Sequence, residues 1–236
     1  IDGHADDKEI ADIFANAYKD VYIDSNNDIA ACAEFKNEYS KLHNLCELPV
    51  IDVNSIKRCV DMLKASKAAG FDGLLAEHFI NSHPAIIFHL KFLFSMFLSH
   101  SYVPEAFGFG VIVPVIKDKR GNISSSDNYR PITLSPIISK LFESLLLEKY
   151  GSFITSDDLQ FGFKNNIGCN TAVFALRQCV EYFSNRGSNV YIASLDASKA
   201  FVRVNYFKLF AALVKRGLPK FVIDTIINWY CKLSAT

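Results

Sequence analysis

The carboxylate of Asp196 is the first candidate for chemistry, because it directly follows the apolar run VYIASL at 190–195. A carboxylate that ends a buried strand costs desolvation energy unless a cation or a hydrogen-bond donor meets it. Sheet ends are also where ligand sites gather in α/β architectures. An aspartate at this place can instead begin a turn by bonding its own backbone. On these residues alone, a cation-binding carboxylate and a turn residue are both open.

A second candidate is the polar loop KDKRGNISSSDN at 117–128, together with the arginine that follows it. Its cations outnumber its anions by two: Lys117, Lys119, Arg120 and Arg130 stand against Asp118 and Asp127. Arginine offers a planar fork of donors and lysine a point charge, a combination that suits a polyphosphate. We therefore weigh a flexible phosphate-binding loop, with its arginine fixed by the proline that follows, against an ordinary solvated loop.

The composition is that of a globular chain without an overall electrostatic bias. Its 236 residues suffice for one large domain or two small ones, half of them are apolar, and the formal net charge is zero. Attraction to nucleic acid must therefore come from local patches. The six cysteines are scattered without a CxxC pair, which indicates reduced thiols in an intracellular protein and no zinc site.

No segment predicts secretion or a membrane span. The first residues, IDGHADDKEI, are acidic and lack an apolar stretch. The most apolar run, 84–100, is interrupted by His89 and Lys91 and is shorter than the roughly 20 residues that cross a bilayer. We expect a buried core helix there, in a protein of the nucleus or cytoplasm.

The periodicity of the apolar residues predicts a mainly helical chain. Helices are expected at 8–22, 28–45, 51–69, 84–100, 136–153, 171–187, 205–217 and from Pro219 to near Tyr230. Asp52 or Asn54 would cap the third, with Ile56, Val60 and Leu63 on its inner face and Gly70 after its end.

Two strands are expected, each with its own constraint. Pro114 interrupts the run VIVPVI at 111–116, which suits an edge strand or a strand end. The run NVYIASLD at 189–196 is apolar on both faces and therefore predicts a central strand covered on both sides. Pro136 opens the helix that follows the loop, with Ser135 as its N-cap.

Four stretches in one order resemble the reverse transcriptases of non-LTR (LINE-type) retrotransposons. They are SKAAGFDGL (66–74), VIVPVIKDKRGN with SDNYRPITLSPIISKLFE (111–143), LQFGFKNNIGCNTAVFAL (159–176) and SLDASKAFVRVN (194–205). The last is similar to polymerase motif A. The resemblance implies an α+β fold with mainly helical fingers and the start of a right-hand palm. It divides the chain into a helical lead-in (1–48), fingers (49–188) and the first part of the palm (189–236), with the remainder of the palm and the thumb absent.

The resemblance also assigns roles to five residues. Asp196 and the backbone carbonyl of Ala197 would bind catalytic Mg²⁺, because two-metal phosphoryl transfer needs hard oxygen ligands. Phe201 would be the steric gate that excludes a ribose 2′-hydroxyl. Lys117 and Arg130 would contact the incoming dNTP triphosphate. The partners of the complete enzyme would be an RNA template, a DNA primer and dNTPs, without a membrane.

Departures from the family pattern bear on activity. Val202 stands where the family has a second aspartate after the motif A aromatic, and Ala69 and Phe71 stand where prolines are common. A QG segment and a YADD-type pair are missing. The pair Asp157–Asp158 is not embedded in a hydrophobic hairpin and is predicted to start a turn or to cap a helix. With a single carboxylate for two metals, we expect a fragment that does not polymerise. The alternatives are a non-catalytic nucleic-acid-binding remnant and a helical scaffold protein.

Overall fold

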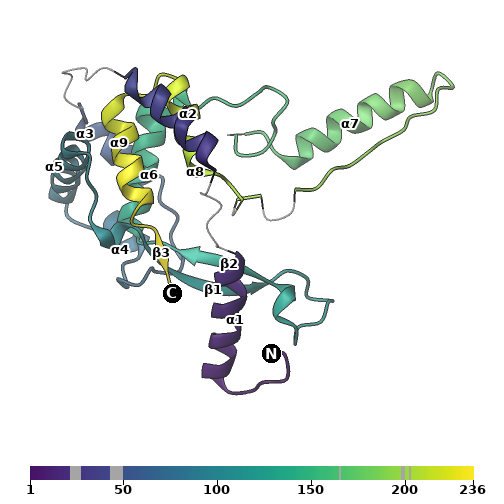
Figure 1. Cartoon of the computed structure of the whole chain (residues 1–236), viewed down its shortest axis with the longest axis horizontal. Helices are drawn as coiled ribbons and strands as arrows, with labels where there is room; N and C mark the ends of the chain where they lie inside the picture. Colours follow the sequence, from purple (N-terminus) through teal and green to yellow (C-terminus); the bar gives the residue numbers. More distant parts are fainter. Residues whose placement is uncertain (22–27, 43–49, 165, 198–199, 202) are drawn as a thin grey trace. The chain divides into compact units, whose positions relative to one another are not determined.

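The computed structural model describes residues 1–21, 28–42, 50–164, 166–197, 200–201 and 203–236. They form two compact units, Ile1–Phe153 with Phe201–Thr236, and Ile154–Ala200. The fold class is α+β, as expected (Figure 1). The helices of the first unit are α1 (Asp7–Val21), α2 (Ile29–Ser40), α3 (Val53–Asp61), α4 (Ala76–Ile80), α5 (Ala85–His100), α6 (Ile137–Tyr150), α8 (Tyr206–Lys215) and α9 (Lys220–Tyr230). Its strands are β1 (Phe109–Ile116), β2 (Tyr129–Leu134) and β3 (Ser234–Ala235), and its 3₁₀ turns are η1 (Glu105–Phe107), η2 (Ser126–Asn128) and η3 (Gly151–Phe153).

The helix starts follow the local cap chemistry. Asp52 accepts a hydrogen bond from the Ser55 amide at 2.8 Å, so the predicted cap of α3 is confirmed. The predicted cap Ser135 is wrong, because α6 begins one residue later with Pro136 at the N-cap and no side-chain cap bond. Helix α1 matches the predicted 8–22, of which position 22 lies outside the described residues. Helix α2 lies within the predicted 28–45 but ends at Ser40; positions 41–42 are not helical, and 43–45 lie outside the described residues.

Helix α3 ends eight residues before its predicted end, at Asp61 instead of residue 69. Beyond it, the Ser66 amide donates to the Glu77 carboxylate at 2.6 Å instead of to a helical carbonyl. Gly70 packs its backbone against Pro136, where an added Cβ would meet the proline nitrogen at 3.0 Å. These tertiary contacts compete with the helix and stop it early.

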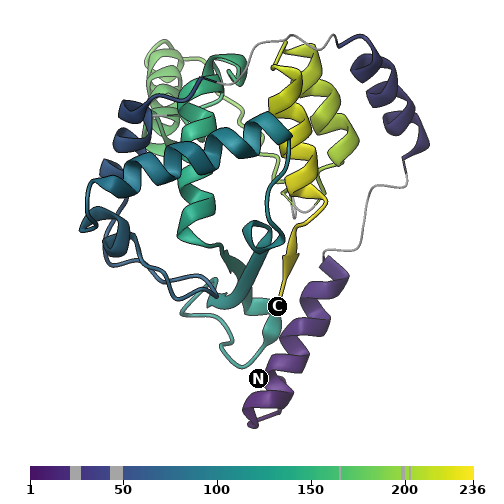
Figure 2. The same cartoon turned by 90° about the vertical axis from the view of Figure 1, so that its left-hand side faces the viewer.

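The core of the first unit lies between its helices and is rich in phenylalanine. Helix α3 packs against α5 and α6, and α5 packs against α9 (Figures 1 and 2). Phe142 on α6 is 0% exposed, and its ring lies 5.1 Å from Phe94, 5.6 Å from Phe97 and 5.6 Å from Trp229, centroid to centroid. The predicted core helix 84–100 is confirmed as α5. Among the described residues, no helix combines the length and the apolar character needed to cross a bilayer.

The small sheet has the strand order β2-β1-β3. Strands β1 and β2 are antiparallel, with Val115 opposite Arg130 and Pro114 opposite Pro131. The Ile112 amide donates to Thr236 at 2.8 Å, so the amides of even-numbered β1 residues point away from β2. The lack of an N–H at Pro114 therefore leaves the β1–β2 ladder intact, and Pro114 lies on an edge portion of β1, as predicted.

The segment before β3 lies against the start of β1. A Cβ added to Gly108 would meet the carbonyl oxygen of Lys232 at 2.2 Å. The backbone angles of Gly108, φ −88° and ψ −10°, are accessible to other residues. Glycine is thus required here by close packing of two backbones and not by its own conformation.

The second unit contains helix α7 (Cys169–Ser184), which Gly187 follows at φ +76° as predicted. The predicted strand 189–196 is not formed among the described residues, where this segment is extended and pairs with no other strand. Leu195 is 99% exposed, so the expected burial on both faces is wrong as well. A strand needs a partner for its amides and carbonyls, and the apolar pattern alone does not supply one.

Candidate nucleotide and nucleic-acid site

The β1–β2 hairpin brings the two predicted phosphate-binding residues together. Arg130 lies on β2 opposite Val115, and Lys117 follows β1 directly. The Lys117 amide donates to the Asn128 carbonyl at 2.8 Å, which extends the ladder by one rung. Side chains two residues apart on a strand share a face, so Lys117 and Arg130 leave the hairpin on the same face. Both side chains are exposed.

The side chains of Lys117 and Arg130 differ in the hydrogen bonds that they already make. Lys117 Nζ donates to the Asp127 carbonyl at 2.5 Å. The Arg130 guanidinium forms no hydrogen bond or ion pair with any residue in the described ranges. Its planar fork is therefore available for two parallel bonds to a phosphate, while Lys117 keeps donors beside its backbone contact.

The loop between the strands contains several hydrogen bonds of its own. The side chain of Asn128 accepts from the Asp118 amide at 3.1 Å and donates to the Asp118 carbonyl at 2.8 Å. The Asp118 side chain accepts from the Arg120 amide at 2.8 Å, and the Tyr129 hydroxyl donates to the Ile123 carbonyl at 2.9 Å. Asn128 is not among the residues predicted from the sequence; the preference of asparagine for turns was the available signal.

Asp196 and Ala197 lie in the second unit, at the end of the extended segment, and both are exposed. No hydrogen bond or ion pair links the Asp196 carboxylate to another residue that the structure describes. It does not terminate a buried strand, so the desolvation argument that singled it out does not apply. Its oxygens are nevertheless hard ligands open to a divalent cation.

Phe201 begins the second part of the first unit and is 75% exposed. Lys117 and Arg130 belong to the same unit, whereas Asp196 and Ala197 belong to the other one. The grouping of all five residues around one nucleotide therefore stays a prediction. Val202, the departure from the family pattern, lies outside the described residues.

The aspartate pair at 157–158 forms a turn, as predicted. Asp157 accepts from the Leu159 amide at 2.8 Å through its side chain, and from the Gln160 amide at 3.0 Å through its carbonyl. In the part of the chain that the structure describes, no three histidine, cysteine, aspartate or glutamate side chains gather in a group that could hold a metal ion.

The comparisons with known proteins bear on these residues. No protein-family model matches the chain. The RNA-directed DNA polymerase from the mobile element jockey of Drosophila funebris is 29% identical over 167 residues, 65% of this chain. A Pol polyprotein from a type-2 retrotransposable element of Drosophila melanogaster is 27% identical over 103 residues, 44% of the chain. A 115 kDa protein in a type-1 element of the same fly is 24% identical over 148 residues, 57% of the chain.

The curated homologues of this chain are proteins of LINE-type retrotransposons. The resemblance that the four sequence stretches carry is thereby confirmed. The matched part spans 10%, 14% and 17% of the lengths of the type-2, type-1 and jockey proteins. The chain therefore matches only a small part of each of these relatives.

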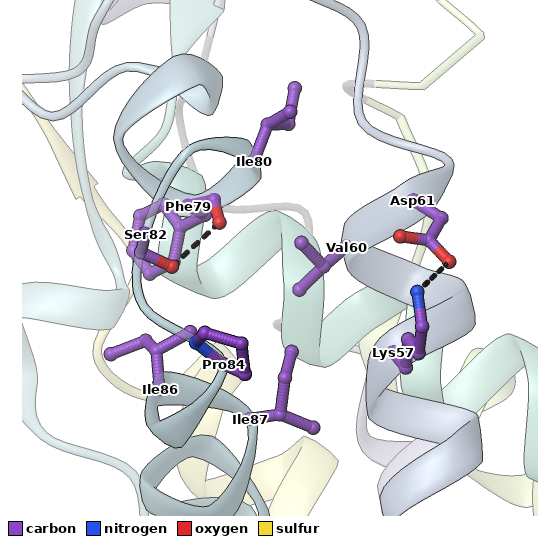
Figure 3. A pocket seen from close by; sticks show the side chains of 9 residues that line it. All are labelled: Lys57, Val60, Asp61, Phe79, Ile80, Ser82, Pro84, Ile86 and Ile87. Carbon is purple, nitrogen blue, oxygen red and sulfur yellow. Dashed lines mark hydrogen bonds and ion pairs between the residues drawn. The ribbon is translucent and has the colours of Figure 1, made fainter.

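A hollow elsewhere in the first unit contains none of the predicted site residues. It has a volume of about 170 Å³, is open to solvent, and lies between α3, α4 and the start of α5 (Figure 3). Its lining is mainly apolar, and the Lys57–Asp61 ion pair, 2.8 Å long, lies at its side (Figure 3). It offers no cluster of cations or carboxylates for phosphate or metal chemistry.

Proposed function

We propose that this chain is part of an RNA-directed DNA polymerase of a LINE-type retrotransposon. The parent reaction adds dNTPs to a DNA primer on an RNA template by two-metal phosphoryl transfer. One observation carries the proposal: a homologue with 29% identity over 65% of the chain is an RNA-directed DNA polymerase. The exposed pair Lys117 and Arg130 on one face of a hairpin supports it, because polymerases must neutralise a triphosphate.

The proposed roles follow from the chemistry of each side chain. Asp196 and the carbonyl of Ala197 would hold Mg²⁺, which supplies charge neutralisation and activates the primer hydroxyl when bound. The exposed Asp196 carboxylate, without a described partner, fits a hard cation. Arg130 would bind and orient the triphosphate through its fork, Lys117 would add a point charge, and Phe201 would exclude a 2′-hydroxyl. Residues 1–48 would be a lead-in, 49–188 fingers and 189–236 the first part of a palm.

A chimera tests the catalytic proposal. The chain is fused to the downstream palm and thumb of a related element and assayed for Mg²⁺-dependent primer extension. We expect extension, and we expect Asp196→Ala to abolish it, because the metal loses a hard ligand. Asp158→Ala is the matched control, since Asp158 is an exposed aspartate of the same unit. A folded, soluble chimera without extension, or one indifferent to Asp196→Ala, would contradict the proposal.

A non-catalytic nucleic-acid-binding remnant is the second candidate. The observation that favours it is that the hairpin cations lie within the first unit, so that phosphate binding does not depend on Asp196. RNA affinity should then fall with salt, and Lys117→Ala or Arg130→Ala should each reduce the salt slope by about 1. Lys36→Ala on α2 is the control, an exposed lysine away from the hairpin. Binding that ignores salt and both hairpin variants would remove this candidate.

A further inference from the structure

The first residues of the chain lie against the loop that carries the hairpin cations. The Asp2 amide donates to the Ser124 carbonyl at 2.7 Å, and the Asp2 carboxylate accepts from the Ser126 amide at 3.2 Å. Asp2 has φ +48°, a left-handed conformation that aspartate tolerates better than most residues. The hydrogen bonds from Ser126 lower the pKa of Asp2 below its usual range. At neutral pH, a carboxylate therefore holds the middle of the loop.

Helix α1 makes a second contact to the same region. Its inner face carries Phe14 and Tyr18, each 7% exposed, and the ring of Phe14 meets the ring of Tyr129 edge-on at 5.0 Å. Figure 1 shows α1 beside the hairpin, and α1 contacts the 3₁₀ turn η2 within the loop. Tyr129 precedes Arg130 and bonds the loop at Ile123 through its hydroxyl. Helix α1 is thus coupled to the loop and to the strand that presents Arg130.

The residues that Asp2 and Phe14 contact are adjacent in sequence to residues that hold or carry the two cations. Ser126, held by Asp2, precedes Asp127, whose carbonyl receives Lys117 Nζ at 2.5 Å. Tyr129, packed on Phe14, precedes Arg130. A loop of twelve residues without such contacts samples many conformations, and ordering it on binding reduces affinity.

We propose that Asp2 and Phe14 are positioning residues that pre-order the hairpin loop so that Lys117 and Arg130 bind phosphates. This inference rests on the proposed phosphate binding by the hairpin. The ligand is the phosphate backbone of an RNA template with its DNA primer, recognised by its negative charge. Residues 1–18 thereby become part of the working site and not only a helical lead-in.

The test measures loop order and affinity separately on the whole chain. Loop order is read from hydrogen–deuterium exchange of the peptide covering 122–129, where the Ser126 amide reports directly on Asp2. Affinity is read with a fluorescein-labelled RNA template annealed to a DNA primer. We expect Asp2→Ala and Phe14→Ala to speed exchange and to weaken binding about two- to tenfold, the effect of losing a single contact of this kind.

Three further variants separate positioning from charge and from general destabilisation. Asp2→Asn keeps an acceptor for the Ser126 amide and should restore most of the affinity despite its lost charge. Asp12→Ala removes an exposed carboxylate on the same helix and should change neither readout. In a Lys117→Ala, Arg130→Ala background, Asp2→Ala should have no further effect on affinity, because residues that act through one another are not additive.

Distinct outcomes overturn the inference and the function beneath it. If Arg130→Ala weakens binding while Asp2→Ala and Phe14→Ala leave it unchanged, the positioning role is wrong and the phosphate site stands. Unaltered loop exchange in both variants, or an undiminished Asp2→Ala effect in the doubly substituted background, also overturns the positioning role. If Lys117→Ala and Arg130→Ala together leave affinity unchanged, the proposed phosphate binding itself fails, and the inference with it.

Discussion

At the scale of single residues, Gly108 is the glycine in the described residues whose backbone leaves the least room for a Cβ. An added methyl group would lie 2.2 Å from the Lys232 carbonyl oxygen, and a backbone cannot yield as a flexible side chain can. We expect Gly108→Ala to separate the β3 segment from β1 and to lower the free energy of unfolding by about 1–3 kcal/mol, as overpacking does. Urea unfolding followed by circular dichroism measures this.

Gly151→Ala provides the matched control at the end of α6. Gly151 has a helical φ of −59°, and an added Cβ meets nothing within 4 Å. Alanine at such a place restricts the unfolded chain and should leave stability unchanged or raise it slightly. Equal losses in the two variants would contradict the explanation by close packing.

The sequence predicted the roles of some single residues and not of others, depending on how far along the chain their partners lie. The Asp52 cap and the turn at Asp157 depend on bonds to amides two or three residues away, so the local sequence suffices. The choice of Pro136 over Ser135 depends on the backbone angles at one junction. The structural role of Asn128 depends on where the far side of the loop lies. The contact of Asp2 with Ser126 joins residues 124 positions apart, beyond any local pattern.

At the scale of elements, a polar clamp joins the start of α3 to the end of α6. The Asp52 carboxylate accepts from Lys149 Nζ at 2.6 Å and from the Ser55 hydroxyl at 2.7 Å. These bonds, Lys149 first, hold the pKa of Asp52 well below its usual range. A lowered pKa in the folded state means that the stabilisation is complete above the unfolded pKa of about 4 and is lost as the pH falls below it.

We therefore expect Asp52→Asn to lower the melting temperature at pH 7, with a difference that narrows as the pH falls below about 4. Asparagine caps helices as well as aspartate does, so this variant isolates the charge. Thermal melts across a pH series measure the effect. Asp61→Asn, at an exposed pair on the same helix, should change little. A pH-independent difference for Asp52→Asn would refute the charge explanation.

Element boundaries were predictable where the sequence itself supplies the stop. Gly187 after α7 and the N-cap of α3 are such cases. The end of α3 was not predictable in this way. After α3, the Ser66 amide bonds the Glu77 side chain and Gly70 packs against Pro136, and neither contact is visible in the local sequence of the helix. The run at 189–196 has the composition of a strand. A strand forms only when a second segment pairs with it, and the residues of the run do not determine whether such a segment is present.

At the scale of the molecule, Phe142 organises the core of the first unit. Its ring, on α6, contacts those of Phe94 and Phe97 on α5 and that of Trp229 on α9. Phe142→Ala should lower the free energy of unfolding by about 3–5 kcal/mol, through lost burial and the cavity that remains. Chemical denaturation measures it. The exposed Phe92→Ala on α5 should stay within about 0.5 kcal/mol, and a comparable loss there would contradict the assignment of the core.

The apolar run at 84–100 predicted a core helix, and the family resemblance implied the α+β class. Neither predicted the division into Ile1–Phe153 with Phe201–Thr236 and Ile154–Ala200, which depends on contacts between distant segments. The five residues predicted for the site are divided between the two units. The sequence indicated that these five residues act together only through its resemblance to a family. The cations Lys117 and Arg130 are the two of them that lie on one hairpin.

Pro114 and Pro131 face each other at one rung of the hairpin, and both lack an amide proton. At this position, neither edge of the hairpin has an amide that could donate a hydrogen bond to a strand of another molecule. This part of the hairpin also exposes apolar side chains that favour association with another molecule, those of Val113, Val115 and Ile132. The proline pair thus interrupts the edges to which a strand of another molecule could bind, and replacing both prolines is expected to favour fibril formation.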